Sequence, residues 1–166
     1  MFRQYRNIEN GEHLIISIYP KLTAKQKTAI QFVSKTQADI PLVYHSDSET
    51  DVLLPMMSRL INKFFQDTRI QPTVVIETMK GREHLATRME TFNYSQSYFI
   101  YRPALDKPNL GIKTTPTRWP QTISDLRNCI DGQGLRIYDE QTIQQLSSFD
   151  QTRARSHTPL DQDGIH

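Results

Sequence analysis

One acidic residue lies where the end of a strand could hold a metal ion. Residues 12–19 have the pattern of a buried strand that runs to a turn at Pro20, and residues 72–77 have the pattern of a second buried strand that ends on Glu77. Two adjacent strands that each deliver a carboxylate would form the metal site of a nuclease. Here the first strand delivers Tyr19, whose neutral phenol is a poor ligand for Mg²⁺. Whether the chain is an enzyme therefore depends largely on that difference.

The middle of the chain carries the positive charge that a nucleic-acid backbone attracts. The net charge is +2, but residues 79–127 contain eight Lys or Arg and four Asp or Glu. Such a stretch fits contacts with phosphates, and it fits an ordinary solvated surface equally well. The candidates for phosphate contact follow Glu77 closely or surround a Thr-rich loop, and they are Lys80, Arg82, Lys113, Thr114, Thr115 and Arg118.

Other chemistry-bearing residue types show no working arrangement. The chain has five histidines, and no pair has the spacing of zinc ligands. Cys129 is the single cysteine, which excludes an internal disulfide and a cysteine metal motif; we expect it on the apolar face of a helix. Gly132 and Gly134 are not followed by the Lys-Ser/Thr pair of a phosphate-binding loop, so the chain cannot hydrolyse ATP by that route.

Length and composition indicate one soluble globular domain. The chain has 166 residues, of which 37% are hydrophobic and 23% charged. The longest strongly apolar run, residues 14–18, is far too short to span a membrane. Apolar periodicity ends before residue 150, so we expect a domain over residues 1–149 and a poorly structured tail over residues 150–166.

Three strands open the predicted fold, at residues 13–19, 28–33 and 40–45. The short polar connections between them favour antiparallel neighbours. Pro41 cannot donate a hydrogen bond to a ladder, so we expect the third strand at an edge of the sheet.

A helix follows, capped near residues 48–51. Two apolar stripes recur along it at four-residue spacing, and both are expected in the core: Val52, Met56, Leu60 and Phe64, with Leu53, Met57, Ile61 and Phe65 beside them. The strand at residues 73–77 then returns through this helix, so it should pair in parallel.

The remaining pattern alternates helix and strand. We expect helices at residues 81–90, from about 118 to 130, and from 140 to 149, with strands at 97–101 and 135–138. The second of these helices should begin at a Thr117 cap and turn Trp119, Ile123, Leu126 and Ile130 inward. The last should begin at an Asp139 cap and bury Ile143 and Leu146.

This order of elements predicts an α/β, ribonuclease-H-like fold. Three antiparallel strands come first and parallel crossover strands follow, so the central sheet is mixed and flanked by helices.

Several motifs in series carry a resemblance to a known family. They are FRQYR (2–6), KTAIQFV (27–33), VVIE (74–77), GIKTT (111–115) and IYDE (137–140). Together they cover nearly the whole chain, and they resemble the C-terminal nuclease domain of the large subunit of phage terminases, the motors that package DNA.

The resemblance implies a DNA endonuclease that uses two Mg²⁺ or Mn²⁺ ions held by three acids. It implies that Glu77 is a metal ligand and catalytic residue and that Tyr19 stands at the position of the first acid. It also implies double-stranded DNA as substrate, portal or other terminase subunits as partners, the bacterial host cytoplasm as location, and no membrane association.

The sequence departs from this family pattern in three places. Tyr19 replaces the first acid. The turn before the second strand, which often carries an acid in the family, reads Lys25-Gln26-Lys27 here. The last acid should follow a glycine and histidine, and the chain ends at Gly164-Ile165-His166. We therefore expect a catalytically impaired nuclease.

Two alternatives remain open at this point. A non-catalytic DNA-binding or packaging-assembly module would keep the fold and the basic loops without needing the acids. A ribonuclease-H-like protein outside this family, such as a resolvase or transposase relative, would be excluded by an upstream ATPase motor in a longer parent gene.

Overall fold

The computed structural model describes residues 1–78, 81–103, 110–113, 115 and 117–148, without the side chains of Trp119 and Ser148. Seven strands form one mixed sheet in the order β1-β4-β3-β2-β5-β6, and β7 pairs with β4 beside this path. The strands are β1 (Phe2–Gln4), β2 (Leu14–Tyr19), β3 (Thr28–Ser34), β4 (Asp39–Ser46), β5 (Thr73–Ile76), β6 (Phe99–Ile100) and β7 (Arg136–Ile137). The helices are α1 (Thr50–Thr68), α2 (His84–Thr91), α3 (Trp119–Asp131) and α4 (Glu140–Ser148).

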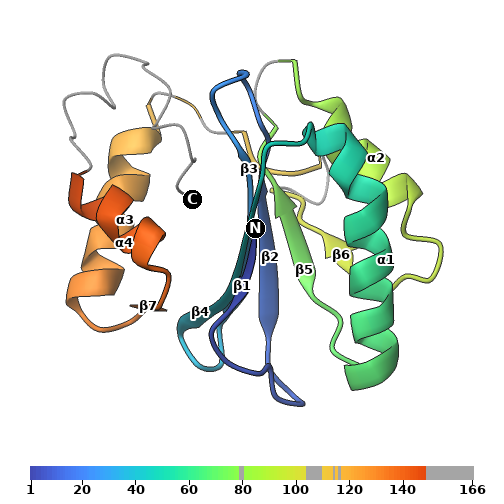
Figure 1. The fold of residues 1–166 in the computed structure, drawn as a ribbon, viewed down its shortest axis with the longest axis horizontal. Coiled ribbons are helices and arrows are strands. Elements are labelled where there is room, and N and C mark those ends of the chain that lie inside the picture. The colour runs from blue at the N-terminus through green and yellow to red at the C-terminus, as the bar shows by residue number, and fades with distance from the viewer. Residues whose placement is uncertain (79–80, 104–109, 114, 116, 149–166) are drawn as a thin grey trace.

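The predicted pairing of the four central strands is confirmed. β2, β3 and β4 form an antiparallel meander, and β5 then pairs in parallel with β2. Helices lie on both sides of the sheet, with α1 and α2 on one face and α3 and α4 on the other (Figure 1). The fold is therefore the three-layer, ribonuclease-H-like arrangement expected from the sequence.

The main core fills the space between the sheet and the pair α1 and α2. Alternate residues of the central strands point into it, because successive side chains of a strand point to opposite faces. Its fully buried members include Ile16, Ile18, Val74 and Ile76 from the sheet. Tyr98 is buried among them and donates its hydroxyl to the Met89 carbonyl (2.7 Å).

The prediction that residues 40–45 form an edge strand is wrong. β4 has β3 on one side and both β1 and β7 on the other. Pro41 is tolerated because the ladder between β3 and β4 shifts register between Phe32 and Ser34, opposite the proline. On the side of β4 that faces the N-terminal segment, the Pro41 carbonyl accepts a hydrogen bond from the Tyr5 backbone N–H (2.9 Å). The short strand β1 that provides this donor was not predicted.

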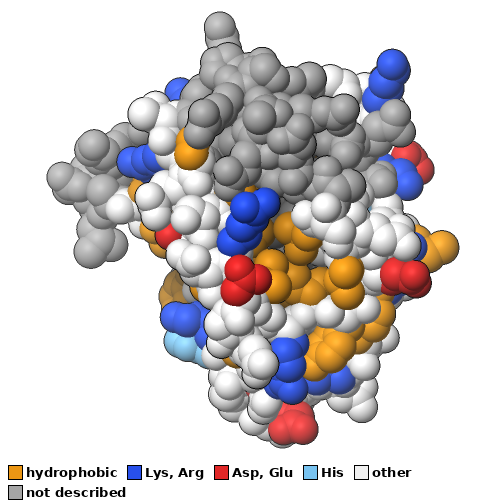
Figure 2. Space-filling model, turned by 90° about the vertical axis from the view of Figure 1, so that its left-hand side faces the viewer, with side chains coloured by type: hydrophobic (Ala, Val, Ile, Leu, Met, Phe, Trp, Pro, Cys, Tyr) orange, Lys and Arg blue, Asp and Glu red, His pale blue; other side chains and the backbone are white. Residues whose placement is uncertain are grey.

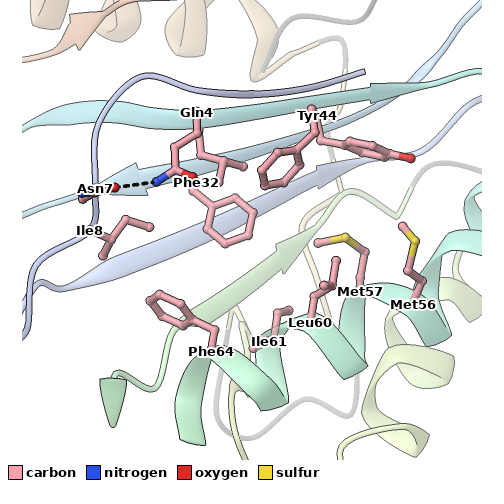
Figure 3. Close-up of a pocket in the computed structure, with 12 residues that line it drawn as sticks. Gln4, Asn7, Ile8, Phe32, Tyr44, Met56, Met57, Leu60, Ile61 and Phe64 are labelled. Carbon is pink, nitrogen blue, oxygen red and sulfur yellow. Dashed lines mark hydrogen bonds between the residues drawn. The ribbon is translucent and has the colours of Figure 1, made fainter. Parts of the chain in front are cut away.

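The prediction that both apolar stripes of α1 are core is wrong for one of them. Leu53, Met57 and Ile61 are buried, whereas Val52 is 69% exposed and Leu60 is 49% exposed. The stripe that contains Met56, Leu60 and Phe64 faces the less covered β1–β4 side of the sheet. Between them lies an apolar groove of about 540 Å³ with walls from α1 and from β1, β3 and β4 (Figure 3).

The C-terminal elements differ from their predicted packing. Residue Arg118, and not Thr117, precedes the first turn of α3, and Ile143 of α4 is 44% exposed although it was expected inside. Cys129 is exposed. The cap of α4 is confirmed, because Asp139 accepts hydrogen bonds from the backbone N–H of Thr142 (2.8 Å) and from its hydroxyl. The expected tail, residues 150–166, lies outside the described residues.

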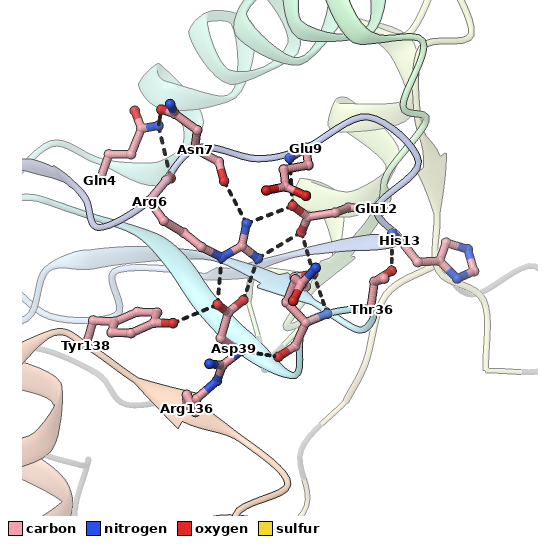
Figure 4. A network of polar contacts seen from close by, with 12 residues as sticks. Gln4, Arg6, Asn7, Glu9, Glu12, His13, Thr36, Asp39, Arg136 and Tyr138 are labelled. Carbon is pink, nitrogen blue, oxygen red and sulfur yellow. Dashed lines mark hydrogen bonds and ion pairs between the residues drawn. The ribbon is translucent and has the colours of Figure 1, made fainter.

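A buried ion cluster closes one end of the sheet (Figure 4). The Arg6 guanidinium donates to both oxygens of Glu12 (2.7 and 2.8 Å) and to both oxygens of Asp39 (2.7 Å each). Ser34 donates to Glu12 and the Tyr138 hydroxyl donates to Asp39 (3.0 Å). The cluster therefore joins the N-terminal segment, the β3–β4 hairpin and β7.

No helix in the described part of the chain is long and apolar enough to cross a membrane.

Candidate functional site

Tyr19 and Glu77 lie side by side at the ends of adjacent strands, as predicted. The parallel register pairs Ile18 with Ile76, so the next residue of each strand is Tyr19 and Glu77. The Glu77 backbone N–H donates to the Ile18 carbonyl (3.1 Å), which continues the ladder to this point. The two side chains leave the sheet on the same face, opposite the α1–α2 core, because Ile18 and Ile76 point into that core.

The same row of the sheet contains a histidine that sequence reasoning missed. Tyr19 pairs with Ala29 across β2 and β3, and Ala29 pairs with His45 across β3 and β4. His45, Ala29, Tyr19 and Glu77 therefore form one row across four strands, and we call it the site row. Spacing along the sequence cannot reveal it, since His45 and Glu77 are brought together only by strand register.

The site row is buried, and its burial affects the ionisation of Tyr19. Tyr19 is 4% exposed, Glu77 3% and His45 6%. Burial raises the pKa of the Tyr19 phenol strongly, and the negative charge of Glu77 raises it further. Tyr19 thus remains protonated at every physiological pH, so it offers a neutral hydrogen-bond donor beside Glu77.

The predicted Thr-rich loop is fixed against the end of β5. Ile112 forms a parallel bridge with Glu77, donating its N–H to the Ile76 carbonyl (2.8 Å) and accepting from the Thr78 N–H (2.7 Å). Gly111 makes this approach possible, because it has φ +81° and a Cβ there would lie 2.4 Å from the Ile76 carbonyl oxygen. The following residue, Lys113, is therefore held next to Glu77.

The basic candidates have different surroundings. Lys113 is exposed. Backbone N–H groups of residues 81–83, just before α2, lower the pKa of the Glu83 carboxyl, and the charge of Lys113 lowers it further. Arg118 is exposed at the start of α3. Arg82 is 28% exposed at its side chain and has Glu49 at 3.9 Å, so part of its charge is already balanced.

The other candidates are less accessible or lie outside the description. Thr115 is half-buried, and its carbonyl accepts from the Arg118 N–H (3.0 Å). Lys80 and Thr114 fall outside the described residues. In the turn before β3, Lys25 is exposed, and half-buried Lys27 precedes Ala29 by two residues, so it leaves the sheet on the face of the site row.

The donor set does not fit a two-metal centre. Two divalent ions bound about 4 Å apart need several carboxylate oxygens. Glu77 supplies one carboxylate, and its strand neighbour supplies a protonated phenol. Within the described ranges no three His, Cys, Asp or Glu side chains are grouped closely enough to hold a metal ion. The described side chains around Glu77 therefore lack the ligands for a pair of divalent ions.

Comparison with solved structures places this fold among viral terminase nucleases. The large terminase nuclease from the thermophilic phage G20c matches with a TM-score of 0.52 at 12% identity, covering 86% of this chain. The human cytomegalovirus terminase nuclease domain, from crystals soaked with manganese, matches with a TM-score of 0.59 at 8% identity, covering 95% of this chain and 86% of that one.

The similarity is one of fold. The chain spans 66% of the length of the phage protein. No protein-family model matches the sequence, and no curated protein matches it. The predicted resemblance to terminase nuclease domains is thus confirmed for the three-dimensional structure, at sequence identities that leave activity to be tested.

Proposed function

We propose that the chain is a DNA-binding nuclease-fold domain of a DNA-packaging terminase large subunit, and that it does not cleave DNA efficiently. One observation supports the proposed lack of efficient cleavage. Strand pairing sets residue 19 beside Glu77, where a metal-dependent nuclease needs a pair of carboxylates, and residue 19 is a buried, protonated tyrosine. The fold shared with two viral terminase nucleases supports the first part.

Within this proposal the residues of the site row have structural roles. Tyr19 fills the position between β3 and β5 and keeps a neutral donor beside the Glu77 carboxylate. No second negative charge is present on that strand end, so no cation is needed to relieve repulsion there. Mg²⁺ or Mn²⁺, which the resemblance implies, would meet a single carboxylate and stay largely hydrated.

Cleavage of supercoiled plasmid tests the proposed loss of activity. We expect no nicking in millimolar Mg²⁺ or Mn²⁺ beyond that of a Glu77→Gln variant, which keeps the size of the side chain and removes its charge. Efficient metal-dependent nicking that Glu77→Gln abolishes would contradict the proposal, and it would mean that other acids, such as Asp47 or Asp163, complete the site.

DNA binding is proposed to occur at the exposed cations near the end of β5. Lys113 is held there by the Ile112 bridge, and Arg118 lies a few residues further along the chain. Contacts of this kind bind random duplex DNA, and their affinity falls steeply with salt because each neutralised phosphate releases counterions. Lys113→Ala and Arg118→Ala should each lower the slope of log affinity against log salt by about 1.

A matched control makes this measurement specific. Lys35 is exposed in the turn at the opposite end of β3, so Lys35→Ala removes the same charge far from Glu77. Fluorescence anisotropy with a random duplex at two salt concentrations should show unchanged binding for Lys35→Ala. Equal effects of all three variants would indicate non-specific attraction only. Undetectable binding at low salt would favour the second candidate function, docking to portal or another terminase subunit through the same surface.

A further inference from the structure

The last described part of the chain forms a unit with its own place in the fold. Residues 117–148 contain α3, β7 and α4, and we call them the C-terminal unit. It lies on the face of the sheet opposite α1 and α2, which is the face to which the site row points (Figure 1). Its backbone ladder with the sheet is short, since only Arg136 and Ile137 pair with β4.

Polar contacts attach the C-terminal unit at the β1–β4 edge. Asp139 accepts hydrogen bonds from Arg3 (2.8 Å) and from the Tyr5 hydroxyl (2.5 Å), and its side chain is completely buried. Next to it, the Tyr138 ring stacks on Tyr5 with 6.0 Å between centroids. The Tyr138 hydroxyl reaches Asp39. These contacts form a latch between the N-terminal segment and the start of α4.

Apolar packing is light among the side chains of the C-terminal unit that the structure describes. The main core cluster takes its residues from positions 16 to 110. In the unit, Ile123 is 9% exposed, but Ile130 is only half-buried and Ile143 is 44% exposed. Figure 2 views the molecule from this side and shows hydrophobic side chains open to solvent among charged ones. A segment with few buried apolar contacts opens at a lower free energy than the whole domain unfolds.

We propose that the C-terminal unit is a flap, held by the Asp139 latch, which opens from the sheet as one piece and uncovers the site row. Opening breaks the two-residue ladder and the contacts of Asp139 and Tyr138, while the α1–α2 core stays intact. A ligand that binds only the uncovered row would shift the population toward the open form in proportion to its affinity for that form. This proposal concerns only access to the site row, so it does not depend on whether the row contacts DNA.

Hydrogen exchange measures the opening directly. Amides of α3 and α4 should exchange at least a hundredfold faster than those of β2, β3 and β5. Asp139→Asn removes the charge that Arg3 and Tyr5 bind and should accelerate exchange in α3 and α4 about tenfold further, with the central strands unchanged. Asp125→Asn is the matched control, because exposed Asp125 of α3 accepts a hydrogen bond from Gln121 within its own helix.

Chemical modification of histidine reports whether opening uncovers the row. His45 is buried in the row and His13 is exposed, so one chain contains both probe and reference. Diethyl pyrocarbonate, followed by mass spectrometry, should modify His45 slowly relative to His13 in the wild type. In Asp139→Asn the His45 rate should rise several-fold at an unchanged His13 rate, and in Asp125→Asn both rates should stay as in the wild type.

Two results would overturn the proposal. Uniform exchange across α3, α4 and the central strands would show that the unit does not open separately. An unchanged His45 rate despite faster exchange in α3 and α4 would show that the unit moves without covering the row. If Asp139→Asn does not fold, as judged by circular dichroism, Tyr138→Phe takes its place. That change removes only the hydroxyl bound to Asp39, and it should raise both readouts about threefold.

Discussion

Removal of Arg6 should destabilise the fold in a way that depends on pH. Arg6 donates hydrogen bonds to both oxygens of Glu12 and both oxygens of Asp39. The two carboxylates are almost completely buried, with side-chain exposures of 2% and 0%. Arg6→Gln would leave both charges buried without their cation. Breaking a buried ion pair in this way costs about 3 to 5 kcal/mol.

The pKa values give a second estimate and predict the pH range. Hydrogen bonds from Arg6, more than any other contact, lower the pKa of Glu12 from 4.5 to about 2, and they lower the pKa of Asp39 as well. A shift of that size for Glu12 corresponds to about 3 kcal/mol. Because a depressed carboxyl pKa stabilises the fold only above the unfolded value, this contribution is complete near pH 7 and is lost as pH falls from about 4.5 to 2.

Urea denaturation at pH 7 and at pH 3 provides the assay. At pH 7 the free energy of unfolding of Arg6→Gln should fall below that of the wild type by about 3 to 5 kcal/mol. At pH 3 the difference should shrink by at least half, because the carboxyls of the variant take up protons. Arg59→Gln, at an exposed position of α1, should change stability little at either pH. A loss in Arg6→Gln that is equal at both pH values would refute the electrostatic reasoning.

Three further changes test other parts of the structure. Gly111→Ala should lower the free energy of unfolding by about 2 to 4 kcal/mol in urea denaturation, because it adds a clash to a strained φ. Gly81→Ala is the control, at φ +83° in open space, and it should lower that free energy by about 1 kcal/mol. Equal losses in the two variants would contradict the argument that Gly111 is needed for the close approach to Ile76. Tyr98→Phe should cost about 1 to 2 kcal/mol by leaving a buried carbonyl unpaired, and an unchanged midpoint would refute this. Tyr19→Asp should create a carboxylate pair with Glu77 that binds Mn²⁺ in calorimetry without efficient plasmid cleavage; rapid cleavage would show that two acids suffice.

The sequence predicts those parts of the fold that depend on strong local patterns. The buried strands before Tyr19 and Glu77 and the long helix between them appear where expected, because their apolar runs leave few alternatives. The adjacency of Tyr19 and Glu77 follows from the parallel crossover. The cap of α4 at Asp139 is a local hydrogen bond, so it too is visible in sequence.

Features that depend on tertiary register are not predictable in this way. β1 has three residues, and its pairing with β4 is unrelated to its own pattern. Val52 and Leu60 repeat like core residues, but the sheet below α1 determines which of two adjacent stripes is covered. His45 joins Tyr19 and Glu77 only through two antiparallel registers. The light packing of α3 and α4 also follows from the surface that they meet and not from their own periodicity.

The residue type at position 19 affects the chemistry of this sheet end without affecting how the backbone is paired. Backbone hydrogen bonds set the side chains of positions 19 and 77 next to each other whatever residues stand there. Two carboxylates in this buried place would repel each other unless a cation joined them or one took up a proton. A tyrosine removes the repulsion and fills the space with a ring that is 4% exposed. This end of the sheet can therefore close without a cation between positions 19 and 77.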